Sequence, residues 1–481
     1  MTLLGRPKGV SCSLFFCFVF VVVAFADAQT VTGTLSNVTR AESWSYFQPI
    51  VPPGPDNPIG DPDYTFFGDR AELGVTVEGS RFDLAGAFNY VRVENLPADA
   101  IGPGGLGTGA FYYAASGVPY SYQLYLSGLS VRIKSSDRRS SITLGRMPFS
   151  SGGEFTSSSP TLERVKRERL QSRLIGNFEW SYYQRRFDGA RIDLDRSTWQ
   201  VTAAAFVPTQ GGFEESTNLS MPKVQVFGGA LTHKRPTAEW QAFAYGYRDR
   251  RPNTAVVDNS GATDRPVDVT IGTFGGSFAS VTESAHGEFD VVGWTAAQFG
   301  DWYGRSQRAG SFAVEGGHRW SRAGLRPWLR GGYLWASGDG NPEDETHGTF
   351  FQMLPSSRQY AQSSVYAQMN LRDLFAQLAL EPSPVKARIE VHKVDVASGA
   401  DLWYQGSGAT SSHDRFFGFS GRSAAESTSL GTVVEGSIDV PIIAHWSVNG
   451  YAAVMSAGDV PRHYFTDKRL TFWSIENVIR F

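Results

Sequence analysis

Apolar and polar residues alternate one by one in segments that recur from about residue 66 to the end of the chain. Residues 70–77 (RAELGVTV) and 385–391 (VKARIEV) are two examples. Because successive side chains of a strand point to opposite faces, each segment has one apolar and one polar face. Roughly 17 such segments of about ten residues can be placed, and this length crosses a bilayer when the strand is tilted.

This pattern predicts an all-β protein, a transmembrane antiparallel β-barrel. Bacterial barrels have an even number of strands, so 18 strands are preferred and 16 are possible. Mean hydropathy is −0.24, and no segment after residue 28 approaches the about 18 consecutive apolar residues of a membrane-spanning helix. A soluble β-sandwich or a propeller would also alternate, but no repeat of about 40–50 residues supports a propeller.

The N-terminus has the features of a secretory signal peptide. Arg6 and Lys8 precede an apolar run from Leu14 to Ala26, and small residues offer a cleavage site before Gln29. The run is shorter than the about 20 residues that a retained helical anchor needs. Both cysteines of the chain lie in this segment, residues 1–28, so the mature chain has no thiol for a disulfide, a nucleophile or a metal.

The C-terminal strand ends on Phe481, with Ile479, Ile475 and Trp473 on the same parity. A last strand that ends on an aromatic residue resembles the signal read by the barrel-assembly machinery. We therefore expect a bacterial outer-membrane location, with contacts to outer-membrane lipid and lipopolysaccharide. Residues 29–65, which include a proline-rich stretch, are expected to form an irregular periplasmic segment before a barrel over residues 66–481.

The stretch from Ser159 to Leu174 has helical rather than strand periodicity and predicts a short helix in a long loop that folds toward the pore. It carries the densest basic cluster of the chain. One interpretation is a vestibule lining or a contact to lipopolysaccharide phosphates; the other, slightly favoured, is a solvated helix balanced by Glu163 and Glu168. The basic loop candidates are Arg164, Lys166, Arg167 and Arg169.

Two blocks of sequence resemble the alginate export family of outer-membrane proteins. Residues 144–194 contain LGRMPF, SRLIGNFEW and RRFDGARIDL, and residues 332–350 contain GYLWASGDGNP followed by HGTF. Residues 401–404 (DLWY) fit as well, and the order of the blocks agrees with the family. The loop from Met147 to Ser172 is longer and more basic than the connection usual in the family, which leaves pore width and substrate open.

The resemblance implies an 18-stranded barrel that passes an anionic polysaccharide through an arginine-rich pore. An arginine ring selects anions, and a guanidinium matches a carboxylate in a bidentate fork. The same arginines can instead pair with lumenal acids and brace the barrel, and the two roles use the same geometry. The pore-lining candidates are Arg146, Arg173, Arg186, Arg191 and Asp188.

The predicted function is passive diffusion of an anionic solute, with a uronate polysaccharide such as alginate as one substrate. A general or small-substrate porin is the first alternative, and a plugged structural or adhesive barrel that binds partners through its outer loops is the second. The eight histidines are scattered without a nucleophile motif, so no enzyme activity, cofactor or metal site is expected. A net charge of −3 without a basic field gives no indication of nucleic-acid binding.

Overall fold

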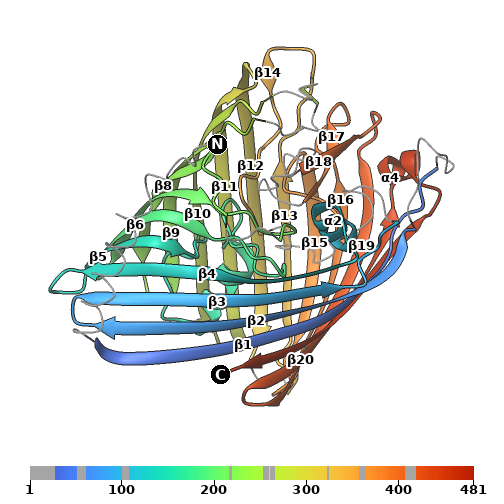
Figure 1. Cartoon of the computed structure of the whole chain (residues 1–481). Helices are drawn as coiled ribbons and strands as arrows, with labels where there is room; N and C mark the ends of the chain where they lie inside the picture. The colour runs from blue at the N-terminus through green and yellow to red at the C-terminus, as the bar shows by residue number, and fades with distance from the viewer. Residues whose placement is uncertain are drawn as a thin grey trace, which may run out of the picture.

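In a computed structural model of the chain, a closed antiparallel β-barrel of 18 strands forms nearly the whole protein (Figure 1). The structure describes residues 28–50, 61–99, 108–215, 219–252, 259–260, 266–321, 324–356, 365–406 and 419–481. Among these residues, no helix is both long and apolar enough to cross a membrane. The predicted fold class is confirmed, with the preferred strand number.

The barrel strands follow one another around the wall, each antiparallel to the next. They are β1 (Ala28–Ser45), β2 (Asp63–Gly79), β3 (Phe82–Glu94), β4 (Tyr120–Lys134), β5 (Ser140–Met147), β6 (Phe187–Asp195), β7 (Trp199–Pro208), β8 (Val224–Lys234), β9 (Ala238–Asp249), β10 (Val269–Ser284), β11 (Gly287–Trp302), β12 (Arg305–Trp320), β13 (Trp328–Ala336), β15 (Leu371–Leu380), β16 (Lys386–Asp395), β19 (Ser429–Ile443), β20 (Trp446–Ala457) and β21 (Arg469–Arg480). The elements that are not strands of the wall are β14 (Thr346–His347), β17 (Leu402–Gly406), β18 (Phe419–Ser423), α2 (Thr108–Ser116), α3 (Pro160–Arg169) and α4 (Asp459–Tyr464).

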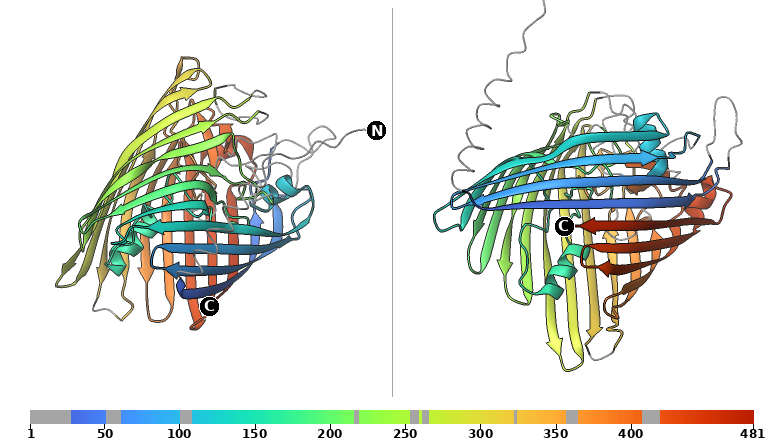
Figure 2. Two further views of the ribbon diagram at one scale, coloured as in Figure 1. Left: turned by 60° about the vertical axis from the view of Figure 1, so that its left-hand side comes forward. Right: turned by 60° about the horizontal axis from the view of Figure 1, so that its bottom comes forward.

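The first and last strands close the barrel, and they lie side by side in Figure 1 and Figure 2. Phe481 takes part in this closure, since its backbone N–H donates to Leu35 O at 2.8 Å and its carbonyl accepts from Leu35 N–H at 3.2 Å. Both strand ends therefore lie at the end of the barrel that carries the short turns. In outer-membrane barrels this is the periplasmic end, and the longer loops lie outside.

The expectation of an irregular periplasmic segment over residues 29–65 is wrong. Ala28–Ser45 forms β1, which pairs with β2 along its whole length and with β21. The alternation of apolar and polar residues is weak in β1 because the polar residues Asn37 and Thr39 lie on its outward face. Both donate hydrogen bonds to Asp69 of β2. The ends of β1 and β2 that follow each other in the chain, Ser45 and Asp63, lie at the end with the long loops. The predicted signal peptide, residues 1–28, lies outside the described residues except for Ala28.

The apolar parity of the strands faces outward, as a lipid-facing surface requires. Val75, Ile389 and Val391 are exposed on this face, while residues of the opposite parity point into the barrel. Trp199, Trp240, Trp320 and Trp446 are exposed near the short-turn ends of their strands. They form the aromatic girdle expected at one membrane interface.

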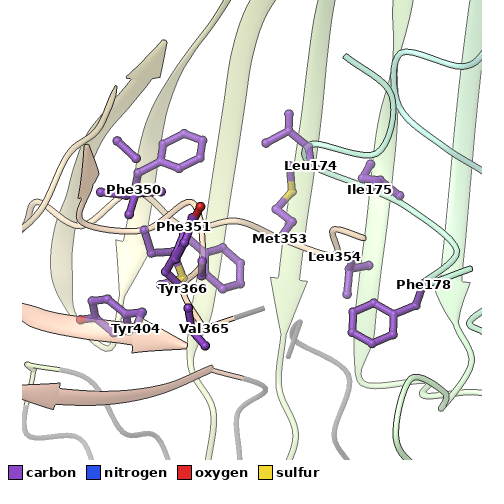
Figure 3. Packing of buried hydrophobic residues seen from close by; sticks show 14 of the residues in the cluster. Leu174, Ile175, Phe178, Phe350, Phe351, Met353, Leu354, Val365, Tyr366 and Tyr404 are labelled. Carbon is purple, nitrogen blue, oxygen red and sulfur yellow. The ribbon is translucent and has the colours of Figure 1, made fainter. Parts of the chain in front are cut away.

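Two long loops fold into the lumen and pack on each other. We call residues 148–186 the α3 loop and residues 337–370 the β13–β15 loop, of which 357–364 are not described. Leu354 N–H donates to Leu174 O, and Gly176 N–H donates to Leu354 O, both at 2.7 Å. Apolar side chains from both loops are buried around this junction (Figure 3). The lumen is therefore partly filled by the chain itself.

The predicted helix is present as α3. Ser159 caps it, since its hydroxyl accepts from Leu162 N–H, and Pro160 opens its first turn. In the right-hand view of Figure 2, α3 is the teal helix inside the barrel.

Candidate functional site: a charged cavity inside the barrel

A cavity of about 550 Å³ lies between the α3 loop and one side of the barrel wall. The wall consists of β1, β2, β15, β16, β19, β20 and β21, and in the last five strands the lining residues lie mostly toward the short-turn ends. Opposite the wall lie the later part of α3 and the residues that follow it. The cavity therefore belongs to the periplasmic half of the lumen.

Charged side chains dominate the lining, with seven basic and five acidic residues. The basic ones are Arg40, Arg70, Arg164, Arg167, Lys386, Arg388 and Arg480. The acidic ones are Glu168, Glu179, Glu381, Asp439 and Glu476. The formal charge of the lining is positive, and a low-dielectric wall strengthens the field that such a surface presents to an ion.

Several of these cations carry no close carboxylate partner. Among the described residues, the side chains of Arg167 and Lys386 make no hydrogen bond or ion pair. Within the described part of the chain, the side chain of Arg70 donates only to the backbone carbonyls of Glu179, at 3.0 Å, and Ser181, at 2.6 Å. A free guanidinium or ammonium in a cavity is available to a diffusing anion.

Other cations of the lining are neutralised within the wall. Arg40 pairs with Glu42 and Glu476, each at 2.7 Å. Arg164 pairs with Glu168 at 2.8 Å and also with Glu381. Burial raises the pKa of Glu381, but the hydrogen bond and charge of Arg164 outweigh it, so the pKa lies below its ordinary value. These pairs hold the cavity's shape.

The side of α3 that faces away from the cavity is held by a buried ionic cluster. Arg169 Nε lies 2.6 Å from Glu315 of β12, and Arg173 lies 3.1 Å from the same carboxylate. Arg330 of β13 lies 3.5 Å from Glu315 and 2.9 Å from Asp290 of β11. All of these side chains are almost fully buried. The cluster attaches the α3 loop to the barrel wall.

Arg173 lies inside this cluster and not on the cavity. Burial lowers the pKa of its guanidinium to about 9, although the negative charge of Glu315 opposes this shift. The sequence therefore identified a lumenal arginine, and the contacts give it a bracing role.

The basic cluster of α3 divides between the two roles. Arg164 and Arg167 line the cavity, whereas Lys166 is buried and pairs with Glu239 of β9 at 2.7 Å, as Arg169 pairs with Glu315. The solvated position expected for the helix is wrong, because α3 lies inside the barrel and acids of the wall compensate its buried charges. The expected balance by Glu163 and Glu168 is present, since Arg164 pairs with Glu168 at 2.8 Å and Lys166 lies 3.6 Å from Glu163. A helix enclosed in the lumen also does not meet lipopolysaccharide.

Arg186 and Arg191 both lie in the lumen. Arg186 reaches Glu72 of β2 at 3.3 Å, and Arg191 pairs with Asp193, its neighbour on the same face of β6, at 2.8 Å. Neither lines the cavity. Their contacts are the bracing contacts that the sequence left open as an alternative.

Arg146 and Asp188 do not line the pore. Arg146 has the parity of Ile142 and Leu144, which are exposed on the outer face of β5. Asp188 lies directly opposite Arg146 on β6, and the two form a bidentate pair at 2.7 and 2.8 Å. The prediction of a lumenal position is wrong for both, because strand parity carries them outward near the end with the long loops.

The cavity residues of the wall were not among the predicted site residues, although the sequence carries a signal for them. In β16, Lys386 and Arg388 have the parity opposite to the exposed Ile389 and Val391. Basic residues on the inward parity of a barrel strand point into the lumen. Parity alone did not indicate which part of the lumen the loops leave open.

Comparison with known proteins gives a family and a fold. Residues 157–467 match the model of the family described as alginate export. None of the curated proteins matches the chain by sequence.

Among solved structures, the chain is similar to Pseudomonas aeruginosa OccK2 (OpdF) in complex with glucuronate, with a TM-score of 0.57, 7% identity, and coverage of 94% of this chain and 98% of that chain. It is similar to Acinetobacter baumannii OccAB2, with a TM-score of 0.58, 7% identity, and coverage of 95% and 98%. It also resembles Pseudomonas aeruginosa OpdK with vanillate, with a TM-score of 0.52, 8% identity, and coverage of 93% and 98%. At such identities the likeness concerns the fold.

Proposed function

The chain belongs to the alginate export family and is a barrel of the bacterial outer membrane, and from this premise we propose that it is a passive channel for anionic solutes, with uronates and their polymers, such as alginate, as the substrate class. The single observation that carries the proposal is the cation-rich cavity in the periplasmic half of the lumen. An anion entering it meets Arg167, Lys386 and Arg70, whose charges no carboxylate of the described wall neutralises at close range.

The chemistry of the lining suits a carboxylated sugar. Arginines bind carboxylates through two parallel hydrogen bonds, and the polar side chains of the wall can accept or donate to hydroxyl groups. The carboxylates in the described complexes of OccK2 and OpdK, glucuronate and vanillate, support the same class of solute. An acid of the lining such as Asp439 repels an anion weakly and keeps it from being bound too tightly.

The loops set the size of the solute. A cavity of about 550 Å³ falls within the range of small-molecule pockets, about 300–1,000 Å³, and suits one or two sugar residues. The passage of a polymer requires the α3 loop to move away from the wall. We therefore propose uronate monomers and short oligomers as the solutes that pass while the α3 loop is docked.

Single-channel recording in a planar bilayer under a salt gradient tests this proposal. We expect anion-selective openings that glucuronate blocks, and a reversal potential that moves toward zero in the double variant Arg167→Ala, Lys386→Ala. Arg462→Ala on the exposed helix α4 is the matched control, because it removes a cation outside the cavity. Openings with weak selectivity in the unaltered protein would favour a general porin.

One observation favours the plugged-barrel alternative: the two inner loops bury a large apolar cluster within the lumen. A folded barrel that gives no conductance in the same experiment would contradict the channel proposal. It would direct attention to the outer loops as a binding surface.

A further inference from the structure

Three side chains that can ligate a metal ion meet on the inner wall of the barrel. Glu390 and His392 lie two residues apart on the lumenal parity of β16, and Glu435 lies directly opposite Glu390 on β19. One potential ligand atom from each lies within 4.8 Å of the others. All three side chains are almost fully buried, with exposed fractions of 1%, 0% and 2%.

The cluster contains buried polar atoms that the protein leaves without a hydrogen bond. Within the described part of the chain, this holds for both carboxylate oxygens of Glu390, for His392 Nε2 and for Glu435 Oε1. Leaving a buried polar atom unsatisfied costs about 1–3 kcal/mol. Unsatisfied buried atoms on three neighbouring side chains whose ligand atoms lie within 4.8 Å of one another are expected where a ligand supplies the missing partner.

A second residue supports this independently. Gln377 of β15 lies directly opposite Glu390 on the other side of β16, and its side chain is 1% exposed. Neither its amide nitrogen nor its amide oxygen has a hydrogen-bond partner among the described residues. A further unsatisfied oxygen ligand therefore borders the cluster.

The histidine is oriented as metal-bound histidines are. Its Nδ1 lies 3.0 and 3.1 Å from the two carboxylate oxygens of Asp373 on β15. Such a carboxylate fixes the tautomer with the proton on Nδ1 and leaves Nε2 free to bind a metal. Nε2 lies 3.6 Å from Glu390 Oε2, close to the about 3.3–3.5 Å that separates ligands of a tetrahedral ion with bonds of about 2.0–2.1 Å.

The donor set selects the ion. One imidazole and two carboxylates suit Zn²⁺ and its first-row neighbours. Mg²⁺ prefers oxygen ligands in an octahedron and gives up its waters reluctantly. We propose that Glu390, His392 and Glu435 form a binding site for Zn²⁺ or a similar divalent transition metal in the barrel wall, with Asp373 as the positioning residue of His392.

The proposed metal site lies between the cavity lining and the contact of α3 with the wall. β16 also carries Arg388, which lines the cavity two residues before Glu390. On the lumen side, the guanidinium of Arg169 from α3 lies 4.3 Å from the ring of Phe375, the residue opposite His392. A bound cation would join β16 to β19 at the place where α3 meets the wall.

The test uses the mature chain, refolded in detergent, stripped with a chelator and dialysed against Zn²⁺. We expect one zinc ion per chain in the unaltered protein, and a visible absorption spectrum of tetrahedral nitrogen–oxygen coordination when Co²⁺ replaces it. His392→Ala should lower zinc affinity at least about 100-fold, and Asp373→Asn about 10- to 100-fold with the same stoichiometry. His463→Ala on α4 is the control and should bind zinc like the unaltered chain.

Absence of zinc binding by the folded, unaltered chain at about millimolar zinc would overturn the proposal. Binding that persists with unchanged affinity in His392→Ala would overturn it as well. If His392→Ala does not fold, Glu390→Gln provides the same comparison with a side chain of equal size. A cobalt spectrum that is the same in Glu390→Gln and the unaltered protein counts against the site.

Discussion

Glu315 is the residue whose loss should release the α3 loop from the barrel wall. Its carboxylate lies between the guanidinium groups of Arg169, Arg173 and Arg330, at 2.6, 3.1 and 3.5 Å. Glu315→Gln keeps the shape of the side chain but removes the charge. The variant thus removes the one carboxylate that these three guanidinium groups share, while the pair of Arg330 with Asp290 remains.

The expected magnitude follows from the burial of these charges. Removing one partner of a buried ionic cluster costs about 3–5 kcal/mol, because the remaining charges stay desolvated. This cost is recovered only when Arg169 and Arg173 leave the lumen with the α3 loop, since Arg330 is fixed in β13. Each 1.4 kcal/mol is a factor of ten, so the ratio of released to docked loop should rise by about 100- to several thousand-fold.

Two assays report on this release. Single-channel conductance should increase as the loop withdraws, and trypsin should cleave the folded variant within the α3 loop, after the basic residues of α3. Glu343→Gln, which alters an exposed acidic residue of the β13–β15 loop, is the matched control. Unchanged conductance together with unchanged resistance to trypsin would refute the idea that this cluster holds the loop in place.

Three further perturbations test other parts of the structure. A Cβ on Gly68 would lie 2.1 Å from the ring of Tyr182, so Gly68→Ala should destabilise the docked loop by about 1–3 kcal/mol, measurable by trypsin sensitivity. Val314 is exposed on the outer face midway along β12, so Val314→Arg should lower the free energy of unfolding in lipid by up to about 2–4 kcal/mol, and an unchanged value would contradict a lipid-facing position. Burial raises the pKa of Asp401 from 3.8 to about 6, although its hydrogen bonds oppose this. The folded protein binds the proton of the Asp401 carboxyl more tightly than the unfolded chain does. Protonation of Asp401 therefore stabilises the fold fully below about pH 3.8, and this stabilisation is lost as the pH rises through about 6. The resistance to proteases of the connection between β16 and β19, which carries Asp401, should fall from pH 4 to pH 7, and Asp401→Asn should remove this pH dependence.

The lipid-facing side of the barrel could be predicted from the sequence because it depends on local parity. Residues such as Val75 and Ile389 face lipid wherever their strands lie in the barrel. The same rule, applied strictly, would have placed Arg146 on the outer face with Ile142 and Leu144. The family resemblance favoured a pore-lining role there, and strand parity overrules it.

β1 escaped prediction because its outer face is partly polar. Asn37 and Thr39 occupy positions where the other strands carry apolar residues, and they are satisfied by Asp69 of the neighbouring strand. Such cross-strand hydrogen bonds are formed only once β1 and β2 are paired. Local alternation therefore carried no signal for this part of β1.

By itself, the sequence determined the fold class, the lipid-facing parity, the C-terminal strand before Phe481 and the presence of a helix near residues 160–169, because each depends on neighbours along one strand or one helix. Only the tertiary structure decided what the lumenal charges do. Arg169 and Arg173 brace the loop while Arg167 faces the cavity, although the three lie within seven residues of one another. Likewise, Glu390 and His392 meet Glu435 only across a strand pair. The role of a charged side chain depends on whether an opposite charge lies within a few ångströms, and in a barrel that partner comes from strands and loops distant in the sequence.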